Sequence, residues 1–97
     1  MSDFRKDVLK CKEMCFEELQ KRERGIEGES TTEQLKTVIL PELDELLIIF
    51  DKKNFPPSQE RFLNSFANAF TTWGWSMQNP TELFLMLNKL NDEYKEL

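Results

Sequence analysis

Residues 79–97 read NPTELFLMLNKLNDEYKEL, and this stretch decides the fold. It opens with Asn79 as a candidate N-cap and Pro80 at the first helical position, the residue types preferred at a helix start. An apolar position then recurs at spacings of four, three, four and three residues, at Leu83, Leu87, Leu90, Tyr94 and Leu97. Such a heptad seam is typical of helices that pack in bundles. The stretch predicts an amphipathic helix that starts at the Asn79 cap.

Three more segments show helical periodicity. The first is expected over residues 3–24, with an apolar stripe at Phe4, Val8, Cys11, Cys15 and Leu19. The second is expected over residues 31–51, and Pro41 predicts a kink or a break within it, because proline removes a backbone hydrogen bond and clashes with the preceding turn. The third is expected over residues 58–73, with core aromatics at Phe62, Phe66, Phe70 and Trp73.

Four such helices in 97 residues predict an all-α fold of one domain, residues 1–97. Short loops between amphipathic helices favour an antiparallel up-down four-helix bundle. The longest apolar run, Leu46 to Phe50, is much shorter than the ~20 residues that a membrane span needs. The start of the sequence has no apolar export segment. We therefore expect a cytoplasmic protein that makes no contact with a membrane.

The residue types that are missing exclude several chemistries. The chain has no histidine and only three glycines, so His-based nucleophile pairs and glycine-rich phosphate loops are excluded. Cys11 and Cys15 share one helix face, which suits two buried, reduced thiols better than a disulfide or a zinc site. We expect a protein that is not an enzyme, with no catalytic residue, no metal and no cofactor.

The negative charge is confined to one segment. Residues 25–51 carry seven acidic side chains and one lysine, whereas the flanking segments are close to neutral. A local field of one sign favours a basic partner and disfavours nucleic acid. The acidic residues that we expect to contact a partner are Glu42, Asp44, Glu45 and Asp51. Glu42 and Glu45 could also hold a hard cation, but a charge run is usually a solvated surface.

Trp75 allows two interpretations. The string Trp73-Gly74-Trp75 lies at an expected helix end, so Trp75 either plugs the open end of the bundle or is an exposed anchor for a partner. The second interpretation adds Trp75 to the candidate partner-binding residues, since tryptophan is favoured at binding hot spots. Ile48 and Ile49, which lie off the apolar stripe of their helix, could add apolar contact.

Three functions remain open at this level. The first is a non-enzymatic protein-binding module whose acidic segment, residues 27–51, docks a basic protein partner. In size, acidity and helical pattern the chain resembles small bacterial immunity and antitoxin-like proteins, without sharing a motif with them. An immunity-type inhibitor of a basic toxin fits this function, and so does an adaptor. The second is an obligate homodimer, in which the second helix is apolar over a wider face than one core needs and the extra apolar residues form the subunit interface. The third is a small-molecule-binding or enzymatic bundle with an aromatic pocket at Phe62, Phe66 and Trp73.

Overall fold

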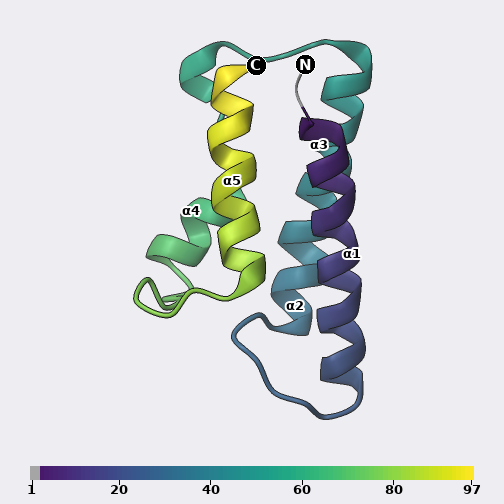
Figure 1. Cartoon of the computed structure of the whole chain (residues 1–97), viewed down its shortest axis with the longest axis vertical. Helices are drawn as coiled ribbons and strands as arrows, with labels where there is room; N and C mark the ends of the chain where they lie inside the picture. The colour runs from purple at the N-terminus through teal and green to yellow at the C-terminus, as the bar shows by residue number, and fades with distance from the viewer. Residues whose placement is uncertain (1–2) are drawn as a thin grey trace.

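The computed structural model describes residues 3–97, and within this range every regular element is helical (Figure 1). The elements are α1 (Phe4–Glu23), α2 (Thr32–Gln34), the π-helical turn η1 (Leu35–Ile39), α3 (Leu40–Lys52), the 3-10 turn η2 (Ser58–Glu60), α4 (Asn64–Thr71) and α5 (Glu82–Glu96). The predicted all-α class is confirmed.

The helix α1 follows the predicted stripe. The five residues Phe4, Val8, Cys11, Cys15 and Leu19 are buried, and both cysteines are free thiols. The helix stops where Gly25 takes a φ of 79°, which glycine adopts without strain. The prediction that Cys11 and Cys15 face inward is confirmed.

The second helical stretch continues through Pro41. Thr31 opens it with a capping box, in which its side chain accepts from the N–H of Gln34 and the Gln34 side chain accepts from the N–H of Thr31, each at 3.1 Å. The stretch runs from α2 through η1 into α3 without a non-helical residue. The π-helical turn η1 directly precedes Pro41, which stands at the start of α3. A π turn beside a proline is a usual place for the hydrogen-bond ladder to be interrupted.

The third helix differs from the prediction. Residues 58–73 do not form one helix, because η2 is followed by extended backbone up to Leu63 and α4 spans only eight residues. The buried residues here are Leu63, Ser65 and Ala69, whereas the side chains of Phe62 and Phe70 are about half exposed (48% and 53%). The expected aromatic core stripe is therefore wrong at Phe62 and Phe70.

The extended backbone of this segment has an identifiable cause. The backbone N–H of Leu63 donates to the buried Oδ1 of Asn91 on α5 at 2.8 Å. A helix through residue 63 would direct that N–H along its own axis, so the contact with Asn91 replaces an intrahelical hydrogen bond. The break brings Leu63 into the core in place of Phe62.

The last helix, α5, has the predicted seam but a different start. Leu83, Leu87, Leu90 and Tyr94 are buried, together with Phe84. The N-cap is Thr81, whose Oγ1 accepts from the N–H of Phe84 at 3.2 Å. The predicted Asn79 cap is wrong, because Asn79 is exposed, lies two residues before the actual N-cap and donates its own N–H to the Ser76 hydroxyl.

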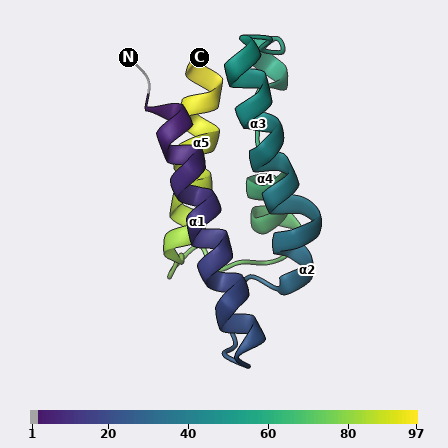
Figure 2. The same ribbon diagram turned by 90° about the vertical axis from the view of Figure 1, so that its right-hand side faces the viewer.

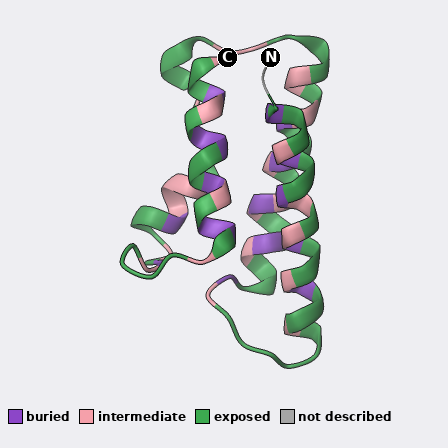
Figure 3. Cartoon of the chain, viewed as in Figure 1, coloured by how far each residue is buried: buried purple, intermediate pink, exposed green. Residues whose placement is uncertain are grey.

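The helices pack around one shared core. Helix α1 contacts α3 and α5, and α4 contacts α5 and η1, so each helical stretch has two neighbours. Figure 1 shows α4 and α5 on one side with α1 and α3 on the other, and the view at 90° shows α1 and α5 on one side with α3 and α4 on the other (Figure 2). Buried residues line the facing sides of the helices (Figure 3). Among residues 3–97, no helix combines the length and the apolar character that crossing a membrane requires.

Candidate functional site

The acidic residues of α3 lie on two different faces of the helix. Asp44 and Asp51, seven residues apart, are directed toward α1, where they pair with Lys12 and Arg5. Glu42 and Glu45, three residues apart, line the opposite side of the helix, toward residues 54–64. Spacings of seven and three both place residues on one face. The predicted acidic surface is therefore divided.

The pairs with α1 reduce the charge that Asp44 and Asp51 present to a partner. Asp44 Oδ1 lies 2.6 Å from Lys12 Nζ, and Asp51 Oδ1 accepts from Arg5 Nε at 3.1 Å. Both aspartates are more than half exposed (58% and 53%), so each pair adds about 0–1 kcal/mol to stability. These two aspartates contribute a field near α3, and their carboxylates are already engaged within the chain.

Glu42 has a role within the fold that the sequence does not reveal. Its Oε2 accepts from the N–H of Asn64 at 2.7 Å, and its Oε1 accepts from the N–H of Ser65 at 2.8 Å. Both N–H groups belong to the first turn of α4, so Glu42 caps that helix from another element. The exposed N–H groups and the dipole of a helix N-terminus stabilise a carboxylate there. Glu42 thus holds α4 against α3.

A surface groove lies beside this cap, between α3 and residues 54–64. Its volume is about 650 Å³. Three glutamates line it, Glu42, Glu45 and Glu60, and among the residues that the structure describes no lysine or arginine does. The remaining lining is mostly apolar or aromatic and consists of Leu46, Ile49, Phe55, Pro56, Pro57, Phe62 and Tyr94, with Asn54 and Asn64. The groove therefore offers negative charge to a cationic group and apolar side chains to an apolar group beside it.

The outer wall of the groove is fixed by Arg61. Its Nε donates to the Pro56 carbonyl at 2.7 Å, and its guanidinium lies 5.7 Å from the centre of the Phe55 ring. A second nitrogen of Arg61 donates to the Leu97 carbonyl at the end of α5. These contacts tie residues 55–61 to the bundle, so the groove is built before any ligand arrives.

Tyr94 forms part of the lining of the groove, and its surroundings change the pKa of its phenol. Burial raises the pKa of Tyr94, and the nearby charge of Glu45 raises it further, while Arg61 opposes the shift. Tyr94 also stacks on Phe4 of α1, with 5.9 Å between ring centres. Tyr94 therefore stays a neutral phenol that can contact an apolar or cationic group.

Trp75 lies in the core, and only 4% of it is exposed. Its ring packs against Trp73 and, edge-on, against Phe84, at 5.5 and 5.6 Å between ring centres. The interpretation of Trp75 as an exposed anchor is wrong for the free chain, and the alternative of a buried plug agrees with its burial. The reason is the turn at Gly74, where a φ of 66° directs the chain back toward the bundle.

The aromatic residues of the third open function do not come together. Phe62 lines the groove beside α3, whereas Phe66 and Trp73 line two other pockets. Across residues 3–97, no group of three acidic, cysteine or histidine side chains is placed to hold a metal ion. The interaction with Cys15, followed by burial, raises the pKa of the Cys11 thiol far above its usual range, which disfavours a reactive thiolate.

Several groove residues were not candidates in the sequence. Glu60, Phe55 and Phe62 lie in a segment for which a helix or a simple turn is predicted, and only Pro56-Pro57 signals the extended backbone that makes a wall there. The position of Ile49 off the apolar stripe of its helix indicates an apolar contact for a partner, and Ile49 does line the groove. Ile48, its neighbour, points to solvent and is 54% exposed.

Comparison of the chain with models of protein families, with curated proteins and with solved structures found no significant match.

Proposed function

We propose that the chain is a non-enzymatic protein-binding module, and that the groove between α3 and residues 54–64 docks a basic segment of a partner protein. The observation that carries the proposal is the lining of this groove, with three glutamates and a half-exposed phenylalanine, Phe62. Arg61, beside the groove, is engaged with two backbone carbonyls. A partner with a lysine or arginine beside an apolar residue would satisfy both parts of that lining.

Glu45 and Glu60 supply the charge that is available to a partner in this proposal. Both are exposed, and within residues 3–97 neither makes a side-chain hydrogen bond or an ion pair. Glu42 contributes less, because its two oxygens are occupied by the α4 cap. Asp44 and Asp51 would act at longer range, through a field that speeds the approach of a basic protein.

The proposal also includes the architecture and setting expected from the sequence. We place the groove on an antiparallel up-down bundle whose second helix changes direction at Pro41, and the π-helical turn before Pro41 supports that change. A cytoplasmic setting suits two buried free thiols, since reducing compartments keep cysteines unpaired.

Site-specific photo-crosslinking in the source cell tests the proposal. A photoreactive phenylalanine replaces Phe62 in the groove, and in a matched control it replaces Phe16 on α1, which is equally exposed (48% and 50%). We expect a discrete adduct with a basic protein from position 62 and none of that size from position 16. Identical adducts from both positions, or none from position 62, would overturn the proposal.

Purification of the captured protein gives the second part of the test. Glu45→Lys with Glu60→Lys should slow its association about tenfold or more at low salt, because steering by charge is lost. The matched control, Glu13→Lys with Glu17→Lys on the exposed side of α1, makes the same change in net charge away from the groove. Equal slowing by both pairs would show that net charge, and not the groove, governs association.

A further inference from the structure

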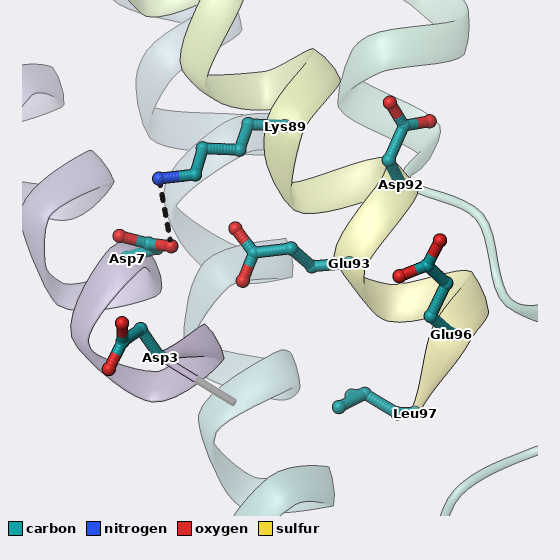
Figure 4. Close-up of a pocket in the computed structure, with 7 residues that line it drawn as sticks. All are labelled: Asp3, Asp7, Lys89, Asp92, Glu93, Glu96 and Leu97. Carbon is teal, nitrogen blue, oxygen red and sulfur yellow. Dashed lines mark ion pairs between the residues drawn. The ribbon is translucent and has the colours of Figure 1, made fainter. Parts of the chain in front are cut away.

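A second pocket, of about 470 Å³, lies at the other side of the bundle, where α1 begins and α5 ends (Figure 4). Five carboxylate side chains and one lysine line it, together with the last residue of the chain: Asp3, Asp7, Lys89, Asp92, Glu93, Glu96 and Leu97. Asp3 and Asp7 come from α1 and its cap, and the others come from α5 and the chain end. The single lysine cannot neutralise this many carboxylates.

The carboxyls of Asp7 and Glu93 face each other across the two helices (Figure 4). Asp7 Oδ2 lies 3.3 Å from Lys89 Nζ, and the Asp7 side chain is only 14% exposed. Glu93 Oε1 is buried and accepts no hydrogen bond from any of the described residues. A buried oxygen that lacks a partner is costly as an ion, and a proton between the two carboxyls would remove that cost.

Burial and the neighbouring acidic groups favour the protonated form of Glu93. Burial is the main cause and the neighbouring Asp7 carboxyl adds to it, so that the pKa of Glu93 is raised to about 7. Lys89 opposes the shift, and Asp3 adds weakly to it. Two carboxyls that share a site cannot both ionise easily, so their protons come off in separate steps that belong to the pair.

We propose that Asp7 and Glu93 share one proton and form a pH-sensitive clasp between the first turns of α1 and the last turns of α5. Protonated, the pair links the two helices by a carboxyl–carboxylate hydrogen bond. When the proton leaves, two like charges face each other beside one lysine, and this end of the bundle loosens. Tyr94, next to Glu93 in the sequence, stacks on Phe4, which lies one turn before Asp7 on α1. These two rings would separate when the clasp opens.

The direction of the pH effect follows from linkage. A carboxyl with a higher pKa in the folded chain than in the unfolded chain binds its proton more tightly when folded. Stability is then highest below the unfolded value of 4.5 and falls as the pH rises toward about 7, with no further loss from this pair above that value. The usual carboxylate in an ion pair gives the opposite slope, so the sign identifies the clasp.

Carbon-detected NMR of the side-chain carboxyls tests the pair directly in the whole chain. We expect the Glu93 carboxyl to titrate near neutral pH. Asp7→Asn should lower the titration midpoint of Glu93, and Lys89→Met should raise it further. Titration of Glu93 near its unfolded pKa value of 4.5, unmoved by either substitution, would overturn the proposal.

Thermal unfolding gives an independent readout. Between pH 5 and pH 8 the native chain should lose thermal stability, and amide exchange at the end of α5 should accelerate more than the general effect of pH requires. Glu93→Gln, which mimics the protonated carboxyl, should lose much less over this range, whereas the control Glu96→Gln should behave as the native chain does. An unchanged pH dependence in Glu93→Gln would contradict the clasp.

Discussion

The carboxylate of Glu42 accepts a hydrogen bond at 2.8 Å from the backbone N–H of Ser65, and so joins α3 to the first turn of α4. Ser65 itself is buried, with 1% exposed. The contact explains how eight residues of α4 keep a fixed place although short helices are marginal in isolation. It also makes Glu42 a structural residue at the edge of the groove.

Replacement of Glu42 therefore affects stability more than a surface glutamate does. Glu42→Ala leaves the N–H groups of Asn64 and Ser65 without their acceptor and should lower the free energy of unfolding by about 1–2 kcal/mol, as loss of a helix cap does. Urea denaturation measures the change. The control is Glu45→Ala, one turn away and exposed, which should stay within about 0.5 kcal/mol of the parent. Equal effects of the two substitutions would refute the capping role.

Asn91 should be equally sensitive for a different reason. Asn91→Ala removes the acceptor of the Leu63 N–H in the core, and a buried donor without a partner costs about 1–3 kcal/mol. Asn88→Ala, on the exposed side of the same helix, should have little effect on the urea midpoint. If Asn91→Ala is as stable as Asn88→Ala, the extended backbone before α4 does not depend on Asn91.

Gly28 is required by the side chain of Arg22. A Cβ at position 28 would lie 2.0 Å from Nη2 of Arg22, and that guanidinium is held by the Ser30 carbonyl at 2.7 Å. Gly28→Ala should therefore cost about 1–3 kcal/mol, since it forces a packed group to move. In an Arg22→Met background the same substitution should cost far less. A constant cost in both backgrounds would place the strain in the backbone instead.

The thiols of Cys11 and Cys15 should react slowly in the folded chain. Both are fully buried, and the raised pKa of Cys11 leaves little thiolate to react. A chromogenic disulfide reagent should label Ser58→Cys, an exposed position, at once, and should label the two native thiols only on unfolding. Immediate labelling of all three thiols in the native state would contradict the burial.

The sequence predicts α1 and α5 well because their buried faces are set by local periodicity. Phe4, Val8 and Cys11 follow one helical stripe, and Leu83, Leu87 and Leu90 follow another. The third helix is predicted poorly because its start depends on Glu42 and Asn91, which are distant in sequence. Periodicity at Phe62, Phe66 and Phe70 favours a long helix, and these long-range hydrogen bonds override it.

The candidate site could be predicted only in part. The acidic character of Glu42 and Glu45 is visible in the sequence, but their separation from Asp44 and Asp51 depends on which neighbour each side of α3 meets. Glu60 and Phe62 could not be assigned to the same groove, because that requires knowing that the chain after α3 returns so that Asn64 reaches Glu42. The burial of Trp75 depends similarly on the turn at Gly74.

The measurement that tests the central claim most directly is the salt dependence of the association rate between this chain and the protein crosslinked at position 62. We predict that the rate for the parent falls steeply between about 20 and 200 mM salt, because screening lengths shorten across this range. For Glu45→Lys with Glu60→Lys, the rate should be about tenfold lower at low salt and nearly independent of salt. A rate for this variant equal to that of the parent at low salt would contradict the account.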